Sequence, residues 1–426
     1  MPAKMLILQS MERKEFEVMA PAGNFECLAA AIQGGADSVY FGVGHLNMRS
    51  HSANNFSADD LQAVVQQCHE AGVKAYLTLN ICLYPEDLPS MRSTLDAAKA
   101  AGVDAIIASD MACISYCRKI GLEVHISTQL SISNAEALRF YSSFADVVVL
   151  ARELNLMQVK EISSAIREEG ICGPSGLPVR IEMFVHGALC MAVSGKCYMS
   201  LHTYGQSANR GACLQICRRG YEVTDLETGG SLNIDHEYIM SPKDLCTIEF
   251  LDKMADAGVR VFKIEGRARS AEYVKRCTSV YREAADAICD GTFTPEFAAG
   301  LKAKLAEVFN RGFWDGYYQG ARLGEWSSVY GTQATRRKVY LGKVTNWFSR
   351  LGVAEIKVET TDLHKGDTLL AIGATTGVLE FPAEDIRLEL TPVEVVPKGS
   401  LCSVKVTGKN FERVHRGDKI FIWKEV

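Results

Sequence analysis

Four cysteines in one short stretch are the residues of this sequence best suited to chemistry. Cys190, Cys197, Cys213 and Cys217 follow the spacing C-x6-C-x15-C-x3-C. Four thiolates held together suit either a tetrahedral zinc ion or an iron–sulfur cluster. Structural zinc sites favour cysteine pairs separated by two to four residues, and only the last pair approaches that spacing. We therefore favour a cluster, with zinc and buried structural thiols as the alternatives.

The neighbours of these cysteines are glycines and basic residues. Glycines give a backbone that can wrap tightly and offer N–H groups to a bound group. A cluster held by four thiolates carries net negative charge, which basic neighbours would stabilise; the simpler interpretation is a solvated basic loop. The glycines are Gly187, Gly195, Gly205 and Gly211, and the basic residues are Lys196, Arg210, Arg218 and Arg219.

A second group of polar residues lies at or just after short apolar runs that read as strands. In a barrel, the ends of strands carry the catalytic groups. Alternate residues of a barrel strand point inward, so the side chains of Lys263 and Glu265 are expected on the same side of the strand. Burying a pair of charged side chains costs free energy, which suggests that this pair serves a functional site. A structural ion pair that closes the barrel is the alternative, and His186 alone could be a core histidine. The group comprises Asn80, Ser127, Gln129, Arg152, Glu153, His186, Lys263, Glu265 and Arg267.

The elements that would position these residues alternate along the chain between apolar strands and helices. Segments such as "EAGVKAYLTLN", "AAGVDAIIAS" and "DAGVRVFKIEG" share one design, in which a glycine ends a helix and a buried strand follows. Eight such strands predict an α/β fold of the TIM-like (β/α)8 barrel type. An open doubly wound sheet is less favoured, because no GxGxxG loop follows the first strand. The strands are expected at 17–20, 38–43, 74–79, 105–108, 124–127, 147–150, 181–185 and 261–264.

The connection between the seventh and eighth strands is far longer than one helix needs, and it contains the four cysteines. Long insertions of this kind are usually functional. From residue 339 onward the pattern changes to the alternation of an all-β module, with Gly-Asp turns in "LHKGDTLLAI" and "VHRGDKIFIW". We expect an N-terminal extension at 1–16, a barrel domain at 17–328 with a Cys-rich insertion at 187–246, and a small β-barrel domain at 339–426.

Composition limits the class of protein. The 426 residues are 47% hydrophobic and 23% charged with a net charge of -5, which is ordinary for a globular protein and does not demand nucleic acid. No apolar run approaches the roughly 20 residues of a membrane-spanning helix, so we expect a cytoplasmic protein without a membrane partner. The 14 cysteines then favour metal binding over disulfides. The sequence has no Ser-His-Asp order signature, no HExxH motif and no Walker loop, so a conventional protease or NTPase mechanism has no visible basis.

Several longer segments together resemble one known family. They are "MAPAGNFECLAAAIQGGADSVYFG", "FVHGALCMAVSGKCYMS", "ANRGACLQICR", "SPKDLC" and "FKIEGRARSAEYVKRCTSVYREA". In this order they are similar to the collagenase-like peptidase family U32. The family name implies proteolysis, but some members are iron–sulfur proteins of oxygen-independent hydroxylation. Their substrates are a wobble uridine of tRNA, a cytidine of ribosomal RNA or the ubiquinone ring.

The length and the single β-module most resemble the tRNA branch, which uses prephenate. The resemblance implies a [4Fe–4S] cluster on Cys190, Cys197, Cys213 and Cys217, with Cys246 as the reserve fourth ligand. It also implies prephenate as co-substrate, the tRNA anticodon loop as partner and dependence on the iron–sulfur assembly machinery. The rival functions are a collagenase-like metallopeptidase and a non-catalytic, cluster-bearing adaptor on tRNA or the ribosome.

Roles follow for the remaining polar residues under the hydroxylase hypothesis. Arginine pairs with carboxylates through two hydrogen bonds, which suits a donor with two carboxylates. The candidates for catalysis are His186, Glu153, Lys263 and Glu265, and those for substrate binding are Asn80, Gln129, Arg152, Arg210 and Arg267.

Overall fold

The computed structural model describes residues 13–51, 55–222, 224–229, 238, 240–320, 324–408 and 411–426. Within them, eight parallel strands close into a barrel, because the last strand, β9, pairs with both β1 and β7. The predicted TIM-like barrel is therefore confirmed. The strands are β1 (Glu17–Pro21), β2 (Ser38–Phe41), β3 (Lys74–Leu79), β4 (Ala105–Ala108), β5 (Glu123–Ile126), β6 (Val147–Val149), β7 (Arg180–Ala188) and β9 (Val259–Ile264).

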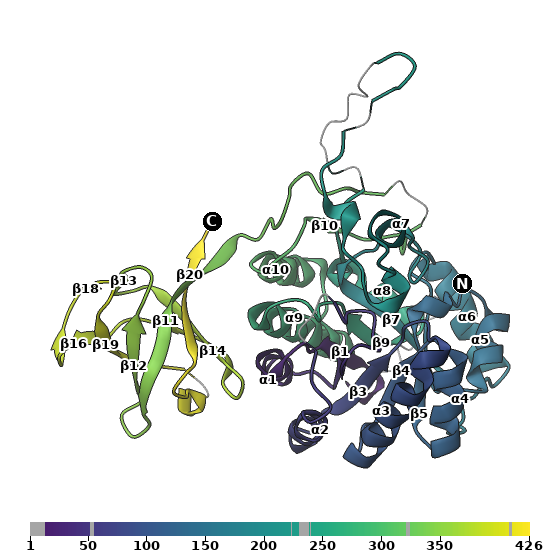
Figure 1. Ribbon diagram of the computed structural model, residues 1–426, viewed down its shortest axis with the longest axis horizontal. Helices are drawn as coiled ribbons and strands as arrows, with labels where there is room; N and C mark the ends of the chain where they lie inside the picture. The colour runs from purple at the N-terminus through teal and green to yellow at the C-terminus, as the bar shows by residue number, and fades with distance from the viewer. Residues whose placement is uncertain are drawn as a thin grey trace, which may run out of the picture.

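Helices alternate with these strands and cover the outside of the barrel (Figure 1). The glycines predicted to separate helix from strand, Gly72, Gly102 and Gly258, all have positive φ, as such helix ends require. The helices are α1 (Phe25–Gln33), α2 (Leu61–Glu70), α3 (Leu88–Ala101), α4 (Met111–Ile120), α5 (Ala135–Ser142), α6 (Leu156–Glu168), α8 (Leu251–Asp256), α9 (Ala271–Cys289) and α10 (Pro295–Ala306).

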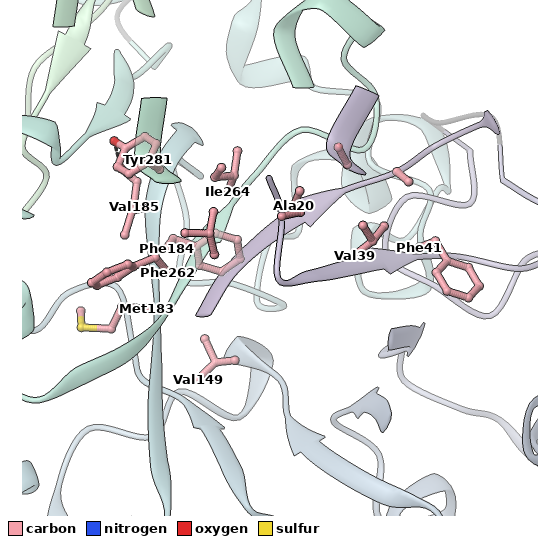
Figure 2. Close-up of a cluster of buried hydrophobic side chains, with 14 of the residues drawn as sticks. Ala20, Val39, Phe41, Val149, Met183, Phe184, Val185, Phe262, Ile264 and Tyr281 are labelled. Atoms are coloured by element: carbon pink, nitrogen blue, oxygen red, sulfur yellow. Dashed lines mark hydrogen bonds between the residues drawn. The ribbon is translucent and has the colours of Figure 1, made fainter. Parts of the chain in front are cut away.

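The main hydrophobic core lies between the strands and the surrounding helices. Figure 2 shows part of it, with Val39 and Phe41 of β2 near Ala20 of β1, and Tyr281 of α9 beside Val185 of β7. A separate small cluster, which includes Tyr40, Tyr76 and Val261, fills the inside of the barrel. This interior is only partly apolar, and the space above it at the carboxyl ends of the strands is where the functional residues lie.

The Cys-rich insertion follows β7. It contains α7 (Met199–Tyr204) and then β8 (Asp244–Cys246), which pairs antiparallel to the end of β7. The two-residue strand β10 (Phe313–Trp314), from the segment "RGFWDGYYQG", pairs with β8. Because β8 pairs with the last three residues of β7, the two ends of the insertion lie side by side at the carboxyl face.

The C-terminal part is an antiparallel all-β region with its own core, as predicted. The two segments with similar sequence form β14 and β20, which pair with each other. The region packs on the barrel through α1, where Gln33 Nε2 donates to the Thr376 carbonyl at 2.6 Å. Its strands are β11 (Arg336–Phe348), β12 (Val353–Val358), β13 (Leu363–His364), β14 (Thr368–Gly373), β15 (Gly377–Pro382), β16 (Ile386–Leu388), β17 (Thr391–Pro392), β18 (Val395–Val396), β19 (Leu401–Lys405) and β20 (Lys419–Glu425).

No helix in the described part of the chain is both long and apolar enough to cross a membrane.

Candidate functional site

A cavity of about 400 Å³ opens at the carboxyl end of the barrel. Its floor comes from the barrel strands, including Tyr40 of β2 and Lys263 of β9. Its upper wall comes from the insertion after β7, which includes all four of the clustered cysteines. The cavity thus joins the two groups of residues singled out in the sequence, as the end of a barrel is expected to do.

Cys190, Cys197, Cys213 and Cys217 all line this cavity. Burial raises the pKa of the Cys197 thiol, and burial likewise raises that of Cys217 although Arg218 opposes the effect. The thiols are near enough to one another to influence each other's ionisation. Without a bound cation, Cys197 and Cys217 are therefore held in the neutral thiol form.

The chemistry of this donor set fits an iron–sulfur cluster. Four cysteine sulfurs face one cavity, and positively charged arginines, among them Arg218, share its lining. Among the described residues, no three His, Cys, Asp or Glu side chains stand close enough to hold a single metal ion. A four-iron cluster bonds each thiolate to a different iron, so its four ligands need not lie within reach of a single ion.

Cys246, the reserve ligand, does not line the cavity. It lies in β8 opposite His186 of β7, and burial raises its pKa to about 11. Its side chain contacts Tyr281 of α9 rather than the four clustered cysteines.

Lys263 and Glu265 both line the cavity, as expected for alternate residues of one strand, but they do not pair with each other. Lys263 Nζ donates to Glu182 Oε1 of the adjacent strand β7 at 2.5 Å. Glu265 instead accepts two hydrogen bonds from the Arg49 guanidinium, at 2.5 and 3.1 Å. The expected Lys263–Glu265 ion pair is therefore absent, and each of the two residues forms an ion pair with a residue of a neighbouring element instead.

The electrostatics of the two pairs differ. Burial lowers the pKa of Lys263, and the Glu182 carboxylate opposes that effect. Burial alone would raise the pKa of Glu265, but the charge of Arg49 outweighs it and holds the pKa at about 2. Glu265 is therefore ionised at neutral pH, and its charge is already compensated by Arg49.

Positive charge exceeds negative charge in the lining. Arg152, Arg218 and Arg267 form no ion pair with a carboxylate of the described residues. Arg267 donates instead to Thr78 Oγ1 at 2.7 Å and Asn47 Oδ1 at 3.0 Å, and burial lowers its pKa to about 10. It remains protonated at neutral pH, so the cavity is suited to an anionic ligand.

The predicted binding residues Arg152, Asn80 and Gln129 also reach the cavity. Arg152 lies over the Phe184 ring at 3.8 Å, and its buried Nε has no hydrogen-bond partner within the described residues. Asn80 Nδ2 donates to Ser127 Oγ at 3.2 Å, and Ser127 in turn donates to Gln129. These amides and the Ser127 hydroxyl form a connected polar wall that could orient a ligand held by the arginines.

Three predicted site residues lie elsewhere. His186 packs among Tyr273, Tyr281 and Phe313, outside the barrel wall, and burial lowers its pKa to about 3. A register irregularity between Phe184 and His186 in β7 interrupts the alternation that would have turned His186 inward.

Glu153 and Arg210 are the other two. Glu153 is exposed and does not line the cavity. Arg210 forms an ion pair with Asp87 at 2.6 Å, and its guanidinium lies over the Tyr84 ring at 3.9 Å. Arg210 therefore connects the insertion to the loop after β3 through this ion pair, and it does not line the cavity.

Sequence reasoning missed several lining residues. Arg49, Arg269 and Arg311 come from loops whose path a sequence does not reveal, although Arg49 follows a predicted strand. Tyr40 lies within strand β2. Its hydroxyl donates to the Ile264 carbonyl at 2.8 Å, and the centre of its ring lies 4.7 Å from Lys263 Nζ. Its inward position could have been found from the alternation of β2.

Comparison with known proteins places the chain among both peptidase-named and RNA-modifying relatives. It is 58% identical to a protein named "Collagenase" from Porphyromonas gingivalis, over 96% of this chain and 98% of the relative. It is 34% identical to "tRNA hydroxylation protein P1" of Bacillus subtilis, over 78% of each chain. It is also 36% identical to "23S rRNA 5-hydroxycytidine C2501 synthase" of Escherichia coli, over 72% of this chain and 46% of that relative. The sequence profile of peptidase family U32 matches residues 23–328, and the chain therefore belongs to this family.

Proposed function

We propose that this chain is an RNA-modifying enzyme that hydroxylates carbon 5 of the wobble uridine in tRNA without molecular oxygen. The names of two relatives, which concern hydroxylation of tRNA and of a ribosomal cytidine, support this reaction class. The observation that carries the proposal is the excess of arginine in a cavity that is also lined by four cysteines. A phosphate backbone and an acidic co-substrate are both anions that such a lining would attract.

The reaction sets requirements that the cavity residues can meet. Replacing a C–H bond by C–OH is a two-electron oxidation of the base, so the reaction needs both a source of the hydroxyl oxygen and an acceptor for two electrons. We propose prephenate, whose two carboxylates would be held by Arg152 and Arg267 through paired hydrogen bonds. Lys263, with its lowered pKa, would be the group that exchanges protons, whereas Glu265, which Arg49 keeps ionised, would act as a fixed negative charge that holds Arg49 in place. Asn80 and Gln129 would orient the bound molecule.

The four clustered cysteines would hold a [4Fe–4S] cluster, which supplies redox or Lewis-acid chemistry when bound. Anaerobically purified protein should then contain iron and sulfide. Cys217→Ser should lose both, while Cys246→Ser should keep them, because only Cys217 lines the cavity. Zinc in place of iron would contradict the cluster. Loss of iron from the Cys246 variant alone would transfer the fourth ligand to that residue.

A peptidase is the second candidate, because the 58% identical relative is named a collagenase. A catalytic metal would need an open coordination position, and four thiolate ligands on one zinc ion would leave none. The donor set therefore weighs against this candidate.

An assay with purified components tests the hydroxylase. Anaerobic protein, prephenate and tRNA lacking the modification should yield 5-hydroxyuridine, detected by mass spectrometry of digested tRNA. Arg267→Gln should raise the prephenate concentration needed for half-maximal rate. The matched control Arg139→Gln, on the exposed face of α5 and ion-paired to Glu136, should behave as the unaltered protein. Cleavage of collagen by the metal-loaded protein, with no change in tRNA, would favour the peptidase.

A further inference from the structure

Exposed tyrosines gather on the insertion and on the segment that passes beside it. Tyr204 at the end of α7 is 47% exposed and Tyr330 is 76% exposed. Large aromatic side chains left in water on one face commonly mark an interaction surface. In Figure 1, α7 and β10 lie at the same end of the barrel.

An arginine connects these tyrosines. Arg219 Nη1 donates to the Tyr204 hydroxyl at 2.6 Å, and the guanidinium lies 5.3 Å from the centre of that ring. This hydrogen bond raises the pKa of Arg219, and Tyr221 and Tyr330 are both near enough to contribute. The Tyr330 ring in turn lies 6.3 Å from the Tyr238 ring, at an interplanar angle of 31°. We call these five residues, Tyr204, Arg219, Tyr221, Tyr330 and Tyr238, the tyrosine row.

The tyrosine row is continuous with the rim of the cavity. The Tyr221 hydroxyl donates to the Ile216 carbonyl at 2.9 Å, and Ile216, Cys217 and Arg218 line the cavity. Arg219 follows directly in the chain and is exposed. The tyrosine row therefore begins one residue along the chain from the lining of the cavity.

Charge decides which partner fits the tyrosine row. Arg219 has no ion pair with a carboxylate of the described residues, in contrast to Arg210, whose charge is neutralised by Asp87. A row of aromatic rings with an uncompensated arginine matches the surfaces on which single-stranded nucleic acids stack their bases. A neutral, proline-rich peptide would also stack on tyrosines, but it would gain nothing from the charge of Arg219.

We propose that the tyrosine row is a stacking surface for unpaired bases of single-stranded RNA, next to the base that enters the cavity. This inference rests on the proposed function and adds to it where the flanking nucleotides lie. Unpaired bases stack on the rings of Tyr204 and Tyr330, and Arg219 contacts a phosphate or a base between them. An anticodon loop can provide such bases, whereas the bases of a duplex are already stacked on each other.

Binding of RNA by the 426-residue protein tests the proposed role of the tyrosine row. The probe is a fluorescently labelled anticodon stem-loop, measured by anisotropy over a range of salt concentrations, with a duplex RNA of equal length beside it. Tyr204→Leu and Tyr330→Leu should each weaken binding of the stem-loop about tenfold, since one stacked base contributes about that much. Arg219→Gln should reduce the dependence of log affinity on log salt by about one unit, whereas the tyrosine variants should leave that slope unchanged.

The control is Phe140→Leu, which removes a 61% exposed aromatic ring from α5 and should leave RNA binding unchanged. If the unaltered protein binds the stem-loop and the two tyrosine variants bind it equally well, the stacking surface is wrong and the proposed function stands. If the unaltered protein binds a triple-helical collagen peptide and neither RNA, both proposals are overturned. Equal weakening by Phe140→Leu would also contradict a surface confined to the tyrosine row.

Discussion

Buried charge defines the candidate site at the scale of single residues. Lys263 and Glu182 are 5% and 0% exposed, so each needs the other to compensate its charge. Glu182→Gln should destabilise the barrel by about 3–5 kcal/mol, because it leaves the lysine charge without a partner. The double variant Glu182→Gln/Lys263→Met should recover much of that loss. Urea unfolding followed by circular dichroism measures both, and an unchanged midpoint for the single variant would contradict the ion pair.

Two buried groups make stability depend on pH in different ranges. Burial lowers the pKa of His186 from 6.5 to about 3, so below pH 6.5 the unfolded chain takes up a proton that the folded chain does not. Burial alone would raise the pKa of Glu265, but Arg49 outweighs it and lowers this pKa from 4.5 to about 2. Ionised Glu265 therefore stabilises the fold fully above pH 4.5, and this stabilisation is lost as the pH falls towards 2. As the pH falls, His186→Phe should reduce the loss of stability that begins at pH 6.5. Glu265→Gln should reduce only the loss of stability below pH 4.5. Thermal unfolding across pH 2.5–7.5 checks this, and identical slopes for both variants would contradict the assignment.

The position of a side chain was easier to predict than its partner. Alternation along one strand was sufficient to place Lys263 and Glu265 on the same side. Their partners, Glu182 and Arg49, depend on the register with β7 and on the path of the loop after β2, which no single segment encodes. The same limit explains His186, because the irregularity that turns it outward arises from the pairing of β7 with β9.

At the scale of elements, the insertion depends on close contact with the loop after β2. Gly211 has a φ of 84°, and a Cβ there would lie 2.1 Å from Ser50 Oγ and 2.4 Å from the Asn47 carbonyl oxygen. Gly211→Ala should therefore detach this part of the insertion from the barrel. Hydrogen exchange should become faster in the insertion while the barrel strands stay protected.

Gly205 provides the matched control for that variant. Its φ of 65° is similarly positive, but a Cβ there would meet nothing within 4 Å. Gly205→Ala should therefore show only the backbone strain, with exchange in the insertion close to that of the unaltered protein. Equal acceleration in both variants would mean that backbone strain, rather than contact with Ser50 and Asn47, accounts for the effect.

Long, strongly patterned elements were predictable, and short ones were not. The glycine-ended helices and buried strands of the barrel follow from local periodicity, and so do the longer strands of the C-terminal region. The sequence did not indicate β8 or β10, because strands of two or three residues form only where another strand is already present to pair with them. β11 begins at Arg336, before the predicted start of the β-barrel domain at residue 339, because Arg336 pairs with Glu425 at the other end of the region.

At the scale of the whole molecule, the barrel brings together residues that are far apart in the sequence. The four cysteines come from the insertion, while Arg152 and Arg267, which have no carboxylate partner among the described residues, follow strands β6 and β9 of the barrel. The same cavity therefore presents thiols on one wall and uncompensated positive charge on another. This combination is the basis for proposing an iron–sulfur hydroxylase that acts on RNA.

The most direct test of that claim is the wobble nucleoside of tRNA in cells that lack the gene. Mass spectrometry of digested tRNA should detect loss of 5-hydroxyuridine and the nucleosides derived from it in the deletion strain. A plasmid carrying the unaltered gene should restore them, and the Cys190→Ala variant, expressed at the same level, should not. Unchanged wobble nucleosides in the deletion strain, or full restoration by the Cys190→Ala variant, would contradict the account.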